Sequence, residues 1–134
     1  MRIIKLFSIT LLLLCLTFGI MIGCDSDGDQ DEELAQDAAV VAPDSYKVLL
    51  DNDRVRVLEY QIKPGKKDAM HSHPAYIVFS ITPGKFMFTL PDGKTMERES
   101  KAGGVIFLEA ETHSTENIGA EAKGLIIELK EPQM

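Results

Sequence analysis

The sequence predicts an all-β domain, and three observations lead to this prediction. From Tyr46 onward the chain reads as short segments of alternating apolar and polar residues, each bounded by turn residues. Beyond residue 44 no segment keeps the apolar period of about 3.6 residues that marks an amphipathic helix. The roughly 90 residues of this part suffice for one small hydrophobic core. Together these observations indicate a single β-sandwich or β-barrel.

Turn signals divide this part of the chain into a series of expected strands. Pro64-Gly65, Pro83-Gly84 and Pro91-Asp92-Gly93 contain the residues that tight turns favour, and Ala102-Gly103-Gly104 marks a bend. The expected strands span residues 46–50, 54–62, 70–82, 85–90, 94–100, 105–108, 112–117 and 124–130.

Residues 1–23 are predicted to be a bacterial lipoprotein signal peptide. Arg2 and Lys5 precede an uncharged apolar segment, which is the pattern of a secretory signal. Met21-Ile22-Gly23-Cys24 resembles the lipobox, whose cysteine is lipidated and becomes the new N-terminus, although Met21 departs from the usual Leu. We therefore expect acyl chains on Cys24 to anchor the protein to a membrane of the bacterial cell envelope, at about 0.8 kcal/mol per buried CH₂. The alternative is an uncleaved membrane anchor with a chance cysteine.

Residues 24–43 are predicted to be a flexible acidic linker that begins at the lipidated cysteine. Of the formal net charge of −7, most belongs here, because seven acidic residues and no Lys or Arg lie between Cys24 and Ala38. From Asp44 onward there are 14 acidic and 12 basic residues, so the domain at 44–134 is nearly neutral. Repelling charges with little apolar surface favour disorder over packing. A calcium-binding loop is the alternative, but the full EF-hand ligand spacing is absent.

Composition narrows the chemistry of the domain further. Cys15 would leave with the signal peptide and Cys24 would be acylated, so the domain has no thiol for a disulfide or a nucleophile. No basic patch with interleaved aromatic residues occurs, and nucleic acid is therefore not an expected partner.

The chain has three histidines, and two of them lie at alternate positions of an expected strand. Residues i and i+2 of a strand point to the same face, so His71 and His73 should present their imidazoles together. The third, His113, also lies in a strand-like segment. Three imidazoles that converge inside a β-barrel would form a metal site.

Two segments around these histidines resemble the sequence motifs of the cupin superfamily. Gly65, five intervening residues, His71-Ser72-His73 and later Gly84 resemble the first motif, and residues 102–117, with His113 followed four positions later by Asn117, resemble the second. The resemblance covers most of residues 50–130 and is to small single-domain cupins, including ones assigned to β-alanine degradation. It implies a single cupin-type jelly-roll β-barrel in which His71, His73 and His113 hold a divalent transition metal (Fe, Zn, Mn, Ni or Cu).

The chain departs from the first motif at its carboxylate. The first motif usually has a Glu three or four residues after the second histidine, and this chain has Ile77 and Val78 at those positions. If the strand runs on unbroken, the face of His71 continues as an apolar wall of Ala75, Ile77, Phe79 and Ile81, although a bulge at Pro74 would change this count. Glu111 lies two residues before His113 and is a candidate substitute ligand. A rim glutamate in solvent is the interpretation that we favour.

Other side chains near the motifs are expected to support the site or the fold and not to bind the metal. Thiol dioxygenases among the cupins also use three histidines and need a cation for the substrate, which Arg54 or Arg56 could supply, but surface positions are expected for both. Tyr76 has the opposite parity to the histidines, which argues against contact with the metal. Asn117 is expected to satisfy backbone groups at a turn.

Two functions follow for such a site. Neutral histidine ligands leave the charge of a divalent ion uncompensated, which favours an anionic ligand. The first function is therefore a metal-dependent enzyme that acts on a small anionic molecule as an oxygenase or isomerase. The second is a non-catalytic envelope lipoprotein that binds a metal or a small ligand. A barrel retained only for interaction is the least favoured reading, and pairing of edge strands into a homodimer is an open alternative for the assembly.

Overall fold

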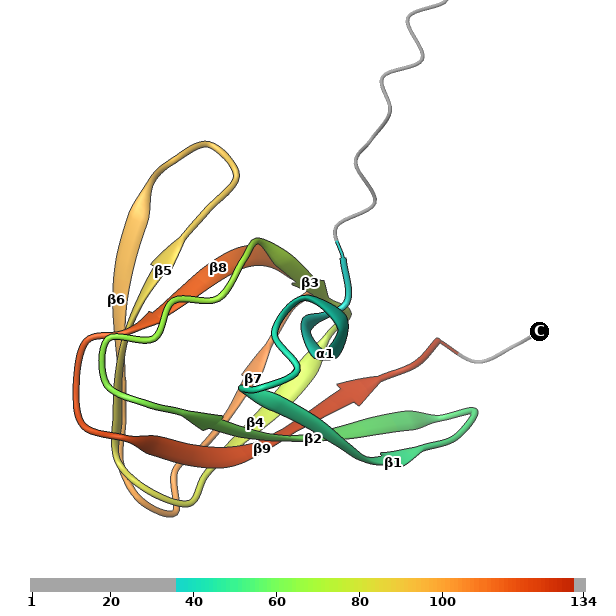
Figure 1. Ribbon diagram of the computed structural model, residues 1–134. Coiled ribbons are helices and arrows are strands. Elements are labelled where there is room, and N and C mark those ends of the chain that lie inside the picture. The colour runs from blue at the N-terminus through green and yellow to red at the C-terminus, as the bar shows by residue number, and fades with distance from the viewer. Residues whose placement is uncertain (1–35, 132–134) are drawn as a thin grey trace, which may run out of the picture. The chain divides into compact units, whose positions relative to one another are not determined.

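A computed structural model describes residues 36–131 as two antiparallel sheets that pack into a barrel (Figure 1). One sheet has five strands in the order β1-β2-β9-β4-β7, and the other has four in the order β3-β8-β5-β6. The strands are β1 (Tyr46–Asp51), β2 (Val55–Ile62), β3 (His71–His73), β4 (Tyr76–Ser80), β5 (Gly84–Thr89), β6 (Thr95–Ser100), β7 (Val105–Leu108), β8 (Glu111–Asn117) and β9 (Ala122–Leu129). The one helix of residues 36–131 is α1 (Ala38–Val41). The predicted all-β jelly-roll barrel is confirmed.

The hydrophobic core lies between the two sheets and follows the alternation of the central strands. In β2 and β9, which pair from Val55–Leu129 to Ile62–Ala122, every second residue points inward. The core members on these strands are Leu58, Tyr60, Ile62, Ala122 and Ile126, joined by Phe86 from the other sheet. The alternation also carries Glu128 inward, two residues beyond Ile126, and this charged residue belongs to the site described below.

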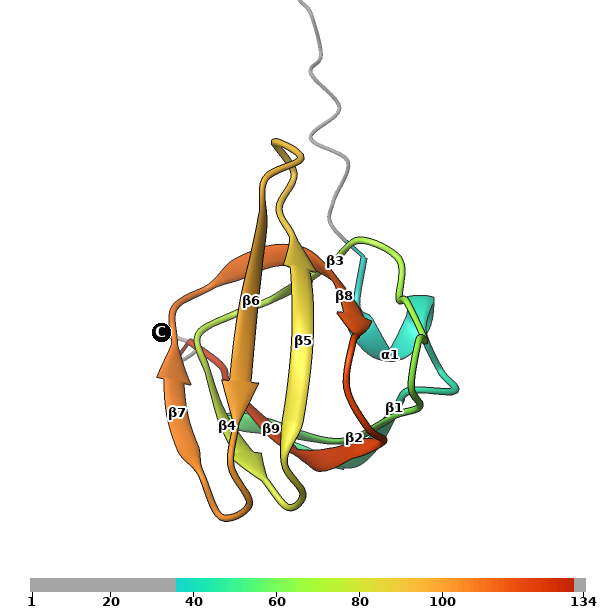
Figure 2. The ribbon, with the colours of Figure 1, turned by 90° about the vertical axis from the view of Figure 1, so that its left-hand side faces the viewer.

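A positive φ explains one glycine, and a tight contact explains another. Gly93 has a φ of +82° in the turn between β5 and β6, a conformation that a side chain disfavours. That hairpin extends beyond the rest of the barrel (Figure 2). At Gly124 a Cβ would lie 2.4 Å from the hydroxyl of Tyr60, its partner in the β2–β9 register, so only glycine fits there.

The packed domain begins before residue 44, which is the boundary predicted from the sequence. Asp37 caps α1 by accepting a hydrogen bond from the Ala39 amide at 2.7 Å. Ala38 and Ala42 are buried members of the core. In Figure 1, α1 lies beside β3 at one end of the barrel. Small side chains therefore let this segment lie close against the sheet, and its residues 38–43 carry none of the acidic side chains of the linker before it.

The expected strand at 70–82 is two strands that belong to different sheets. β3 pairs with β8 in the four-stranded sheet, and β4 pairs with β7 and β9 in the five-stranded sheet. The break falls at Pro74-Ala75, because proline has no amide hydrogen to continue the ladder. The parity of His71 therefore does not continue past the break. The expected apolar wall is wrong, since Phe79 and Ile81 are exposed and Ser80 is buried.

Several predictions concern residues outside those that the structure describes. They are the signal peptide at 1–23, the lipidated Cys24 and the linker up to residue 35. Among residues 36–131, no helix has the length and apolar character needed to cross a membrane.

Candidate metal site

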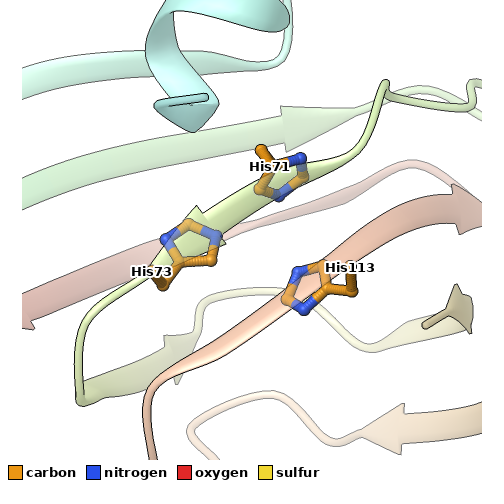
Figure 3. Close-up of side chains that lie close together, drawn as sticks. All are labelled: His71, His73 and His113. Atoms are coloured by element: carbon orange, nitrogen blue, oxygen red, sulfur yellow. The ribbon is translucent and has the colours of Figure 1, made fainter. Parts of the chain in front are cut away.

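The three histidines meet between the sheets, and all come from the four-stranded sheet. His71 and His73 lie on β3, and His113 lies on β8 directly opposite His71 in the register. The ring centroids are 4.9 to 5.4 Å apart, and one nitrogen from each ring lies within 4.8 Å of the others. Figure 3 shows the three rings gathered between the two strands. All three side chains are buried.

Each histidine has an oxygen acceptor near its Nδ1 atom. Nδ1 of His71 is 2.8 Å from the carbonyl oxygen of Ala69, and Nδ1 of His73 is 2.6 Å from Oε1 of Glu128. Nδ1 of His113 lies 3.3 Å from Oε1 of Glu111. A proton on Nδ1 leaves the lone pair on Nε2, the arrangement that metal-ligating histidines commonly adopt.

The Nε2 atom of His71 is buried without any hydrogen-bond partner within the described chain. Burial lowers the pKa of His71 from 6.5 to about 4 and also lowers the pKa of His113, because a charged imidazole loses its hydration there. Both rings are therefore neutral at pH 7, which is the form that binds a metal. A buried, neutral and unpartnered ring nitrogen is a costly feature that a metal ion would satisfy.

Glu128 supports His73 from the opposite sheet. Its second oxygen, Oε2, lies 2.8 Å from Nε of Arg56, whose guanidinium also forms an ion pair with Asp37. The expectation of a surface position for Arg56 is wrong, because these contacts hold its largely buried side chain against β9. Arg54 lies outside the strands, and its side chain is exposed. Glu128 was not among the site residues predicted from the sequence, although an acidic residue at an inward-facing position of an apolar strand is a usable signal.

Glu111 has a different environment from the one that we expected. Arg98 donates to both of its oxygens, at 2.7 and 2.8 Å, and the hydroxyl of Tyr76 donates to Oε1 at 2.5 Å. The side chain is only 19 % exposed, so the rim glutamate in solvent is wrong. Burial by itself raises the pKa of Glu111, but the hydrogen bonds from Arg98 and Tyr76 and the nearby His113 ring lower it far below its usual range.

Tyr76 also lies on a different face of its strand from the one expected. It lies on β4, beyond the Pro74 break, and therefore points into the barrel, with its ring centroid 4.8 Å from that of His73. Burial and the neighbouring Glu111 carboxylate raise the pKa of its hydroxyl, which stays protonated and donates to Glu111. Asn117 has the expected structural role, because its buried amide donates to the carbonyl oxygens of Ile62 and Ala120.

A cavity of about 80 Å³ lies beside the histidines. Most of its walls are apolar or aromatic, and His73 and His113 form part of one side. Arg98 is the one basic residue lining this cavity in the described chain, and its guanidinium stacks 4.5 Å from the ring centre of Phe88. Val78, at one of the two positions for the motif glutamate, also lines the cavity. The arrangement is a small apolar pocket with a set of nitrogen ligands at its wall.

Comparisons with known proteins agree with this architecture. No family model matches the sequence, and no curated protein matches it. Among solved structures, a cupin domain from Bordetella pertussis Tohama I is 28 % identical, with a TM-score of 0.59 over 64 % of this chain and 92 % of that one.

Two more distant structures share the fold. A cupin superfamily protein from Desulfitobacterium hafniense DCB-2 is 17 % identical, with a TM-score of 0.50 over 64 % of this chain and 76 % of its own. An RmlC-like cupin with a double-stranded β-helix fold from Methanocaldococcus jannaschii is 16 % identical, with a TM-score of 0.51 over 63 % and 78 %. The chain therefore folds as a cupin-type jelly-roll barrel, and its similarities support membership of the cupin superfamily.

Proposed function

We propose that the protein binds one divalent transition metal through His71, His73 and His113. The observation that carries the proposal is the buried, unpartnered Nε2 of His71, within a cluster whose Nδ1 atoms lie 2.6 to 3.3 Å from oxygen atoms. Imidazole suits Fe, Zn, Ni and Cu, and Mn is a further candidate, so the ligand set alone does not select the metal.

The charges around the site favour an anionic ligand on the metal. Among the groups that form ion pairs beside the histidines, Asp37, Glu111 and Glu128 carry three negative charges, and Arg56 and Arg98 carry two positive ones. With a divalent ion, these groups sum to +1. A monoanion in an open position would neutralise this buried charge. A metal held in this way would supply Lewis acidity and lower the pKa of bound water.

The ligand that we propose is a small molecule that enters the apolar cavity and coordinates through an anionic group. Small carboxylates come first, as the resemblance to cupins assigned to β-alanine degradation suggests. Catalysis of an oxygenase or isomerase type is one use of such a site. The other is non-catalytic binding of a metal or small ligand, and one observation favours it. Glu111, Tyr76 and Arg98 are bonded to one another, which leaves no carboxylate, phenol or guanidinium of this group free for acid–base work.

Elemental analysis of the purified full chain tests the metal proposal. We expect about one equivalent of a transition metal in the wild-type protein and little in His73→Ala and His113→Ala. Asp92→Asn is the control, because it removes an exposed ion pair with Lys94 in the turn between β5 and β6. Circular dichroism of each variant checks that loss of metal is not loss of fold. Absence of metal from wild-type protein, with none taken up on adding Zn²⁺, Fe²⁺, Ni²⁺, Cu²⁺ or Mn²⁺, would refute the proposal.

We also propose that the protein is a lipoprotein of the bacterial cell envelope, tethered to the membrane through Cys24. The support is the sequence pattern of residues 1–24, with its charged start, apolar segment and lipobox-like end. Labelled fatty acid should be incorporated into the wild-type chain and not into Cys24→Ser. The other cysteine supplies a matched control, since Cys15→Ser should still be labelled. Labelling of Cys24→Ser would overturn the tether.

A further inference from the structure

The segment that leads into the barrel is joined to the strand that bears two of the histidines. The carbonyl oxygen of Gln36 accepts a hydrogen bond from the amide of Ser72 at 3.0 Å, and Asp37 pairs with Ser72 as a parallel bridge. Ser72 is the residue between His71 and His73. The backbone of the entering segment thus lies directly along β3, and α1 continues beside it (Figure 1).

The side chain of Asp37 makes a second connection to the site. One oxygen, Oδ1, caps α1 at the Ala39 amide, and the other, Oδ2, forms an ion pair with Arg56. Arg56 in turn lies 2.8 Å from Oε2 of Glu128, whose Oε1 lies 2.6 Å from Nδ1 of His73. Four side chains therefore form a continuous series from the entering segment to the imidazole.

Each member of the series constrains the next. Glu128 is 4 % exposed, and a buried carboxylate needs a cation to offset its lost hydration. Arg56 supplies that cation, and its planar guanidinium is held on both sides because Asp37 takes a different nitrogen. A carboxylate held in this way fixes the orientation of a histidine ring and directs its other nitrogen towards a metal.

We propose that Asp37 and Arg56 are positioning residues for His73, so that the segment entering the barrel is a working part of the metal site. This inference rests on the proposed metal-binding function. It gives a role at the site to Asp37, which was predicted to lie in a linker, and to Arg56, which was predicted to lie on the surface. The entering segment thereby sets the metal affinity of histidines that lie more than thirty residues further along the chain.

Asp37→Asn separates the two tasks of this residue. Asparagine caps a helix as well as aspartate does, so α1 should persist, while the negative charge facing Arg56 is lost. Arg56→Gln removes the centre of the series, and Arg56→Lys should not rescue it, because one ammonium cannot reproduce the two-sided contact. Asp92→Asn is the matched control, since it removes an exposed carboxylate–cation contact in the turn between β5 and β6, outside this series.

The first readout is the Zn²⁺ affinity of the full chain, measured by competition with a chromophoric chelator. We expect a loss of about ten-fold for Asp37→Asn, about ten- to a hundred-fold for Arg56→Gln, and no change for Asp92→Asn. Because the residues act in one series, the double variant Asp37→Asn/Arg56→Gln should be no weaker than Arg56→Gln alone. Equal losses in all variants, or losses that only follow lowered melting temperatures, would overturn the proposal.

The second readout needs no metal. In the metal-free wild-type protein, nitrogen-15 NMR should find His73 as one tautomer, with its proton on Nδ1. Arg56→Gln should mix the two tautomers, and Asp92→Asn should not. If wild-type protein binds no Zn²⁺, the proposed function fails, while this measurement still decides whether the series orients His73. An unchanged tautomer in Arg56→Gln, together with unchanged affinity, refutes the positioning role.

Discussion

Glu111 lies opposite His73 in the register of β3 and β8, yet its carboxylate binds Arg98 through both oxygens. A glutamate two residues before a site histidine is therefore not free to replace the carboxylate that the first cupin motif usually has. Its contact with Nδ1 of His113, at 3.3 Å, places it behind that ring as a support.

Glu111→Gln should therefore keep its metal. We expect an unchanged stoichiometry, in contrast to His113→Ala, together with a loss of about 1–3 kcal/mol in the free energy of unfolding, because Arg98 loses its charged partner. Elemental analysis and urea unfolding measure the two effects. A loss of metal as complete as in His113→Ala would identify Glu111 as a ligand instead.

The metal-free protein should lose stability as the pH falls from about 6.5 towards 4. Burial lowers the pKa of His71 to about 4, so the unfolded chain takes up the proton first, and the stabilisation present above pH 6.5 is lost as pH approaches the folded value. The full loss from this group is about 3 kcal/mol. Urea unfolding between pH 7 and 4.5 measures it, with His71→Gln as the variant in which the step should shrink. A free energy that stays constant over this range contradicts the prediction.

Metal binding should raise the melting temperature, because the ion binds the folded site and not the unfolded chain. At a free Zn²⁺ concentration of 100 times the dissociation constant, the stabilisation is about 2.7 kcal/mol. A chelator should reverse it, and His73→Ala should show no shift with Zn²⁺. Differential scanning fluorimetry measures the shift. An equal shift in His73→Ala would mean that Zn²⁺ binds elsewhere.

Ile77 and Val78 occupy the two positions at which the first cupin motif usually has its glutamate, so substitutions at the two positions can be compared. Val78 lines the cavity, whereas Ile77 has the opposite parity and pairs with Phe107 and Ile127 in the sheet. Val78→Glu should destabilise the metal-free protein by several kcal/mol, because it buries a carboxylate in an apolar wall. Zn²⁺ should recover more stability in Val78→Glu than in wild type, and Ile77→Glu should respond like wild type. Equal Zn²⁺ responses in the two variants would show that position 78 does not reach the ion.

Association into a homodimer through an edge strand stays a prediction, and β7 is the edge to test. Its residues Val105, Ile106 and Phe107 are 64, 47 and 54 % exposed, and an open strand edge presents unpaired backbone groups. Light scattering after size exclusion should give twice the monomer mass for the wild type and the monomer mass for Phe107→Lys. A monomeric wild-type protein would end this prediction.

The sequence sufficed for most of the strands and for the gathering of the histidines, because both follow from alternation within one strand and from the motif spacing. His71 and His73 share a face by parity, and pairing of β3 with β8 brings His113 opposite. The alternation failed at Pro74, since a parity count ends where a strand changes sheets. Tyr76 was consequently placed on the wrong face.

The supporting residues could not be predicted for a different reason. Glu128 reaches His73 across the barrel, and Arg56 and Asp37 reach Glu128 from other elements. Such contacts depend on which strands are neighbours in the folded sheets. Local pattern shows that Glu128 faces inward, but nothing in the chain order says that it meets β3.

His73 and its carboxylate support come from opposite walls of the barrel. His71, His73 and His113 belong to the four-stranded sheet, whereas Glu128 belongs to β9 of the five-stranded sheet. An ion that orders the His73 ring should therefore also stabilise the contact between the two sheets, and not only the residues around the ion. Amide hydrogen exchange should slow along β9 when metal is added, at backbone groups that never touch the ion.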